Sequence, residues 1–165
     1  MKNIIYSFLG TTLDSHRREN MRWSFWRPSV ALALQDDLHF DEFHIWYQER
    51  FQGLFDVIAK DILASSPGTE VIPELLELRD PWDFEEVYGK LYDFSRLQKF
   101  IPEENNYYIH ITTGTHVAQI CLFLLNESHH LPGKLIQTQP SHGSNSVQGK
   151  YTIIDLDLSR YDLLA

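Results

Sequence analysis

The sequence predicts an α/β fold in which about six strands, most of them parallel, form a doubly wound sheet with an antiparallel pair at its C-terminal end. Short runs rich in β-branched and aromatic residues alternate along the chain with longer segments whose apolar residues recur at helical spacing. The last two strand-like runs are joined by a Gly- and Ser-rich stretch without a helical pattern, so these strands must pair antiparallel. With 165 residues, the chain is large enough for one domain with its own hydrophobic core.

Three strands and two helices are predicted in the first half of the chain. Residues 3–9 form the first strand, residues 29–34 a short helix and residues 43–47 the second strand. Residues 69–78 form the third strand, and we expect it at an edge of the sheet because Pro73 cannot donate a ladder hydrogen bond. The helix before it ends ahead of Pro67 and has an apolar face made of Phe51, Leu54, Phe55, Ile58 and Ile62.

Two further helices and three strands are predicted in the second half. Asp80 is the predicted N-cap of the third helix, with Pro81 at its first helical position. The strands cover residues 107–111, 133–139 and 151–158. The third helix presents Phe84, Val87, Tyr88 and Leu91 on its apolar face, and the fourth buries Val117, Ile120, Cys121 and Leu124.

Small polar turns follow the first and fourth strands. Gly10, Thr11 and Thr12 come directly after the first strand, and residues 112–116 connect the fourth strand to its helix. If these strands are parallel neighbours, both turns meet in one crevice, where helix N–H groups and the positive end of the helix dipole attract anions. The two turns predict a phosphate-binding site composed of Gly10, Thr11, Thr12, Thr112, Thr113, Gly114, Thr115 and His116.

Four arginines form a basic cluster in a chain whose net charge is −9. Arg17, Arg18, Arg22 and Arg27 are interleaved with aromatic residues, a composition typical of contacts with single-stranded nucleic acid. We include these four arginines in the predicted ligand site. The alternative is that Trp23 and Trp26, three residues apart, anchor a short helix to the core while the arginines stay solvated.

Composition and motifs exclude several classes of protein. The net charge of −9 argues against a protein that coats nucleic acid with its whole surface. Neither the G-x-G-x-x-G dinucleotide fingerprint nor a P-loop occurs, and the histidines lack metal-ligand spacing, so no cofactor and no metal site are expected. A single cysteine, Cys121, excludes an internal disulfide framework and is expected as a buried thiol. No membrane-spanning run or signal pattern is present, and we expect a cytoplasmic protein.

Five blocks of sequence carry a family resemblance over essentially the whole chain: residues 8–14, 26–28, 80–88, 109–121 and 154–162. With these blocks the chain resembles the N-terminal sensory domains of sigma-54-dependent regulators of the RNA terminal-phosphate cyclase operon. These domains belong to the CRISPR-associated Rossmann fold (CARF) superfamily. The resemblance implies a Rossmann-like sensing domain over residues 1–158. Residues 159–165 would then begin a linker to ATPase and DNA-binding domains that this sequence does not contain.

The resemblance also implies a function. Such a domain restrains its own ATPase domain until it binds RNA, here an end bearing a 2′,3′-cyclic phosphate, and it pairs as a homodimer. We expect a sensor without catalytic residues. The alternative is an RNA-cleaving enzyme, because relatives of this fold include ring nucleases that cut cyclic oligoadenylates. His116 supports this alternative, since an imidazole could assist attack by a ribose 2′-OH, whereas in a sensor it would donate to phosphate or cap its helix.

Overall fold

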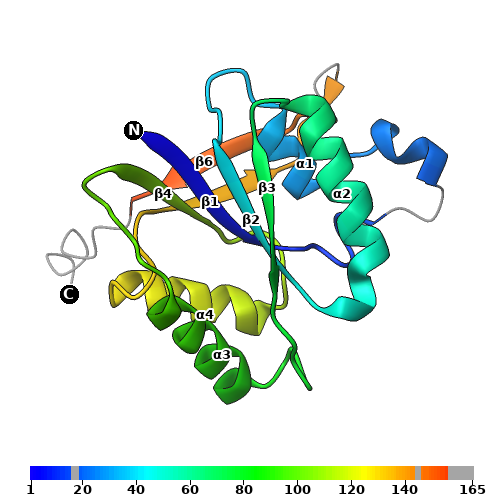
Figure 1. The fold of residues 1–165 in the computed structure, drawn as a ribbon. Helices are drawn as coiled ribbons and strands as arrows, with labels where there is room; N and C mark the ends of the chain where they lie inside the picture. The colour runs from blue at the N-terminus through cyan, green and yellow to red at the C-terminus, as the bar shows by residue number, and fades with distance from the viewer. Residues whose placement is uncertain (16–18, 144–145, 156–165) are drawn as a thin grey trace, which may run out of the picture.

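A computed structural model describes residues 1–15, 19–143 and 146–155 of the chain. In this described part, six strands form one sheet in the order β3-β2-β1-β4-β5-β6 (Figure 1). The first five strands pair parallel, and β6 pairs antiparallel with β5, as predicted. The strands are β1 (Lys2–Phe8), β2 (Glu42–Tyr47), β3 (Glu70–Leu75), β4 (Asn105–His110), β5 (Lys134–Gln139) and β6 (Lys150–Ile154).

Helices cover both faces of the sheet, which confirms the doubly wound α/β fold (Figure 1). The helices α1 (Pro28–Ala33) and α2 (Gln52–Ser65) lie on one face, and α3 (Phe84–Leu97) and α4 (His116–Glu127) lie together on the other. Two 3-10 segments, η1 (Glu19–Ser24) and η2 (Glu49–Phe51), precede α1 and α2 respectively. Each face therefore has its own apolar core between sheet and helices.

The sheet places a proline at its edge, as the sequence predicts. Pro73 lies in β3, which pairs only with β2 among the described strands, and it stands opposite Ile45. The neighbouring strand β2 is buried from Phe43 to Tyr47, because helices cover both of its faces. β6 ends at Ile154, and the predicted continuation to residue 158 lies outside the described residues, as does the predicted linker over 159–165.

The start of α3 corrects a prediction. The helix begins at Phe84 instead of Pro81, and its N-cap is Asp83, whose side chain accepts a hydrogen bond from the Glu86 N–H. Asp80 instead accepts from the Trp82 N–H at 3.0 Å, and the Glu86 carboxylate accepts from the backbone N–H of Asp80. These bonds stabilise a separate turn ahead of the helix, which puts Pro81 and Trp82 in the β3–α3 connection.

The buried face of α4 also differs from the prediction. Ala118, Cys121, Leu122 and Leu125 are buried, whereas Ile120 is 52% exposed and Leu124 39% exposed. A helix that is apolar on most sides has no clear polar face, so residue spacing alone could not orient it. Cys121 is buried as predicted, and burial raises the pKa of its thiol to about 11. Among the described residues, no helix has the length and apolar character needed to cross a bilayer.

Candidate functional site

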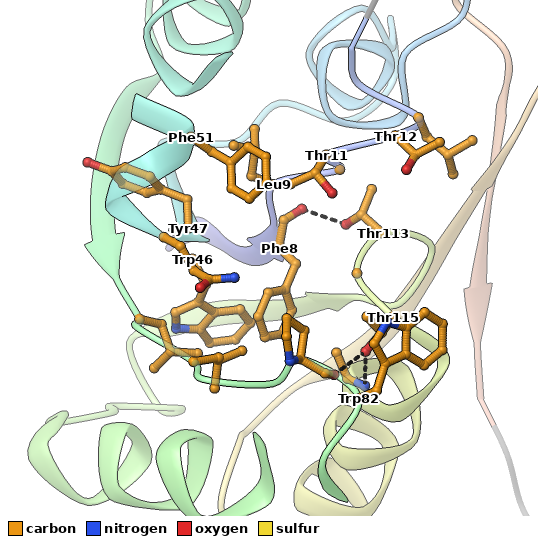
Figure 2. Close-up of a pocket in the computed structure, with 18 of the residues that line it drawn as sticks. Phe8, Leu9, Thr11, Thr12, Trp46, Tyr47, Phe51, Trp82, Thr113 and Thr115 are labelled. Carbon is orange, nitrogen blue, oxygen red and sulfur yellow. Dashed lines mark hydrogen bonds between the residues drawn. The ribbon is translucent and has the colours of Figure 1, made fainter. Parts of the chain in front are cut away.

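The turns after β1 and β4 meet at the carboxyl edge of the sheet. The two strands are parallel neighbours, with Lys2 opposite Asn105 and Tyr6 opposite Ile109. A cavity of about 750 Å³ opens at this edge, lined by residues that follow β1, β2, β3 and β4 (Figure 2). This is where an open parallel sheet binds ligands, since the strand order changes direction at β1.

Most of the predicted turn residues line the cavity. They are Gly10, Thr11, Thr12, Thr113, Gly114, Thr115 and His116. Thr112 is the exception, because its hydroxyl accepts a hydrogen bond from the Thr138 N–H at 2.8 Å and donates to the Thr138 carbonyl. Thr112 therefore links β4 to β5 beside the site and does not face the cavity.

The first turn of α4 supplies backbone donors. The Thr115 side chain caps the helix by accepting from the Ala118 N–H at 3.1 Å, and it donates to the Pro81 carbonyl at 2.8 Å. Among the described residues, the N–H groups of His116 and Val117 have no protein partner. Gly114, at φ +89°, brings this turn against Phe8, 3.4 Å from where a Cβ would lie. The turn can therefore hold an anion through main-chain N–H groups and the helix dipole.

Thr113 lines the cavity, but its hydroxyl is used in a hydrogen bond within the protein. Thr113 is 1% exposed and donates to the Phe8 carbonyl at 2.6 Å (Figure 2). At the end of β4, His110 contacts the Ser7 hydroxyl through Nδ1 and the Thr138 hydroxyl through Nε2, each at 2.8 Å. Burial lowers the pKa of His110 to about 3, so the imidazole is neutral and can join both hydroxyls. These bonds hold the two turns together from inside the sheet.

Asp14 positions the first turn, a role that the sequence did not reveal. Its buried carboxylate accepts from the Gly10 N–H at 2.8 Å, from the Ser29 N–H at 3.0 Å and from the Ser29 hydroxyl at 2.6 Å. Burial raises the pKa of Asp14, although these hydrogen bonds and the nearby Arg27 oppose the rise. A Cβ at Gly10 would lie 2.8 Å from the Asp14 carboxylate and 3.0 Å from Thr113, so only glycine fits where the turns meet.

Two of the four predicted arginines bind a buried acid instead of lining the cavity. Arg22 and Arg27 each contact Asp61 Oδ2 of α2 at 2.6 Å, and both Arg27 and Asp61 are almost fully buried. Burial raises the pKa of Asp61, but the hydrogen bonds and charges of the two guanidiniums outweigh this, so its net pKa is lowered. A buried carboxylate needs such partners, which is the physical reason for the correction. Arg17 and Arg18 lie outside the described residues.

The two tryptophans of the same segment, Trp23 and Trp26, lie outside the cavity lining. Trp23 is 40% exposed, and the Arg27 guanidinium lies over its ring at 4.9 Å from the centroid. Trp26 is half-buried and lies against Gly149, next to the start of β6. Neither tryptophan lines the cavity, so the expected stacking of bases on this segment has no counterpart at the described site.

One wall of the cavity was missed by the sequence interpretation. It comes from the end of β2 and from η2, and comprises Trp46, Tyr47, Gln48, Arg50 and Phe51. Figure 2 labels Trp46, Tyr47 and Phe51 on this wall. Across the cavity, Trp82 is 59% exposed and meets the His116 ring edge-on, with 5.8 Å between centroids. The rule that loops after neighbouring parallel strands gather at one edge would have pointed to this wall.

The chemistry of the lining favours binding of an anion. Among the described lining residues, Arg50 carries a permanent positive charge, and no carboxylate is present. The described residues also contain no group of histidine, cysteine and acidic side chains that could hold a metal ion. The cavity thus combines N–H donors, hydroxyls, one guanidinium and aromatic rings, without a pair of groups set for acid and base catalysis.

Comparison with known proteins gives matches at the level of sequence and of fold. The family RtcR, described as "Regulator of RNA terminal phosphate cyclase", matches residues 1–165. The chain is 48% identical over 166 residues to the transcriptional regulatory protein RtcR of Escherichia coli (strain K12), covering 99% of this chain. It spans 31% of the length of that relative.

Two solved structures share the fold. Enterococcus italicus Csm6, bound to cyclic hexa-2′-fluoro-hexa-dAMP, superposes with a TM-score of 0.73 at 15% identity, over 99% of this chain and 43% of that one. Can2 from Sulfobacillus thermosulfidooxidans, in complex with cyclic tetra-adenylate, has a TM-score of 0.53 at 16% identity, over 83% and 32% of the two chains. At these identities, the likeness shows a shared Rossmann-like α/β fold.

Proposed function

The chain belongs to the RtcR family of regulators of RNA terminal phosphate cyclase, and we propose that it is the ligand sensor of such a regulator, binding RNA that ends in a 2′,3′-cyclic phosphate. One observation carries the proposal. The cavity joins the N–H groups at the start of α4 to a guanidinium and aromatic rings, with no carboxylate among its described lining residues. Such a lining suits a phosphate attached to a nucleoside.

The charge of the cavity favours a cyclic phosphate over the other ends that RNA can carry. A 2′,3′-cyclic phosphate is a compact monoanion, which a helix N-terminus and one guanidinium can balance. A 3′-phosphate carries nearly one more negative charge at neutral pH, since the second pKa of a phosphate monoester is about 6. A 3′-hydroxyl end brings no terminal charge to the helix N-terminus. The monoanion therefore fits this lining best.

The alternative function for the same cavity is cleavage of RNA. His116 lies at the start of α4 in the lining, where an imidazole could assist attack by a ribose 2′-OH. No carboxylate of the described lining orients it, and its ring contacts Trp82. We therefore propose a binding role for His116. Incubation with end-labelled RNA and with cyclic tetra-adenylate distinguishes the roles, since a sensor leaves both intact and a nuclease shortens one of them.

We further propose that the chain pairs as a homodimer through α4. Ile120 and Leu124, four residues apart, form an exposed apolar stripe that begins at His116. Phe84, at the start of the neighbouring helix α3, is also exposed. A two-fold axis along this face would bury the apolar side chains and bring two cavities together.

In the longer regulator, we propose that this domain, over residues 1–158, restrains an ATPase domain that follows a linker beginning at residues 159–165. The chain spans 31% of its E. coli relative, so most of that relative lies outside the matched region. β6 starts opposite Gln139 and ends opposite Leu135, so it runs from the cavity edge of the sheet to the opposite edge. A signal from the cavity would therefore have to cross the sheet to reach the linker.

Competition for a labelled RNA ending in 2′,3′-cyclic phosphate tests the proposed ligand. We expect unlabelled RNA with the same end to displace the label at a lower concentration than the same RNA with a 3′-hydroxyl. Cyclic tetra-adenylate should compete more weakly than the cyclic-phosphate RNA. Stronger competition by cyclic tetra-adenylate would replace the proposed ligand with the one present in the Can2 structure.

A further inference from the structure

Arg50 lines the cavity on the wall formed by the end of β2 and by η2. It lies in η2, directly after β2, and its side chain is exposed. Its guanidinium lies over the ring of Phe51, 4.8 Å from the centroid, and Phe51 lines the same wall. Contact with an aromatic face restricts the guanidinium without using its N–H donors, so they stay available for a phosphate.

The electrostatic surroundings make Arg50 the main positive charge of the cavity. No carboxylate belongs to the described lining, although the whole chain has a net charge of −9. Arg22 and Arg27, which the sequence suggested for this role, bind Asp61. A cleft that carries one sign of charge within an oppositely charged protein concentrates the field on its ligand. Among the described arginines, Arg50 is therefore the one that lines the cavity in which RNA would bind.

Strand β1 lies between Arg50, which follows β2, and the N-terminus of α4, which follows β4. β2 and β4 are both neighbours of β1, so their carboxyl ends lie about 10 Å apart at the usual strand spacing. A phosphate held by the N–H groups at the start of α4 is thus separated from the wall that bears Arg50 by the width of β1. Two sites at this separation match two successive phosphates of an RNA strand better than one phosphate held twice.

We propose that Arg50 binds the last phosphodiester of the RNA, the one that precedes the terminal nucleotide, while the start of α4 holds the cyclic phosphate. This assignment rests on the proposed function and adds to it the direction in which the RNA leaves the cavity. The RNA passes from the turn before α4, over the end of β1, toward η2. Arg50 then contributes affinity for a 3′-terminal segment of RNA and no discrimination between its possible ends.

The proposal is tested by removing the charge of either Arg50 or the last phosphodiester. The probes are two trinucleotides of uridine ending in 2′,3′-cyclic phosphate, one natural and one with an uncharged methylphosphonate in place of its last phosphodiester. The variants are Arg50→Gln and, as a matched control, Arg96→Gln. Arg96 is also exposed and lies over an aromatic ring, that of Tyr92 at 5.7 Å, but it is outside the cavity lining.

We expect Arg50→Gln to bind the natural trinucleotide about tenfold more weakly than the unaltered chain, as for loss of one charged hydrogen-bonding contact. It should bind the methylphosphonate probe as the unaltered chain does, and Arg96→Gln should bind both probes normally. An equal loss for both probes would show that Arg50 contacts another phosphate, and no loss for either would remove Arg50 from the site. Failure of the unaltered chain to bind the natural trinucleotide would overturn the proposed function as well.

Discussion

Substitution of Asp61 by asparagine should destabilise the protein strongly. The change keeps the shape of the side chain but removes the charge that two guanidiniums contact at 2.6 Å. Arg27 is 2% exposed, so its charge would remain buried without an acid partner. Removal of one partner from a buried ion pair costs about 3–5 kcal/mol. In a chain of 165 residues, each kcal/mol lowers Tm by about 2–4 °C, so we expect Tm to fall by at least about 6 °C.

The same variant tests the assignment of the two arginines. Thermal unfolding by circular dichroism gives Tm, and Asp56→Asn, an exposed position on the same helix, serves as the control with a change below about 2 °C. At 10 °C, Asp61→Asn should still bind RNA with normal affinity, because neither Arg22 nor Arg27 lines the cavity. An unchanged Tm would refute the buried ion pair. A marked gain in RNA affinity would show that the freed arginines reach the ligand.

Three other changes test the turn, the buried histidine and the α4 surface. Gly114→Val should abolish RNA binding and lower stability by about 2 kcal/mol. Gly143→Val, with a similar φ of +86° but no neighbour, should bind RNA normally. RNA titration and thermal melting of both variants distinguish the effect of backbone strain from the loss of the binding site. His110 has a folded pKa of about 3 against 6.5 unfolded, so the unfolded chain takes up a proton first as pH falls. Denaturant unfolding should show about 2 kcal/mol lost from this group between pH 7 and pH 5, a loss that His110→Gln lacks. Ile120→Glu should convert a dimer to a monomer by light scattering, and a monomeric unaltered chain at micromolar concentration would contradict the dimer.

The order of strands and helices along the chain and the two turns of the site could be predicted from the sequence, because local patterns determine them. Pro73 marked β3 as an edge strand, since the missing N–H is a property of the residue itself. Gly10 and Gly114 marked the turns that meet at the cavity, because small polar clusters after apolar runs indicate strand ends. These features depend on residues close together in the chain.

The rest of the site depends on contacts between distant residues. The partner of Arg27 is Asp61, 34 positions away, and no local pattern pairs them. Trp46 and Arg50 follow one another closely, but the first belongs to a buried strand and the second to a 3-10 turn, so neither was distinguished from ordinary core and surface. Thr113 was expected to face a ligand, and only the packed sheet shows that its hydroxyl is used by the Phe8 carbonyl.

Titration calorimetry of three RNAs that differ only at their 3′ ends tests the central claim most directly. The ends are a 2′,3′-cyclic phosphate, a 3′-phosphate and a 3′-hydroxyl, each measured at a low and a high salt concentration. Contacts with the RNA backbone weaken as salt rises for all three, whereas recognition of the end persists as a ratio between them. We predict the tightest binding for the cyclic phosphate at both salt concentrations. Equal affinities for the three ends would contradict the claim that this cavity recognises a cyclic phosphate.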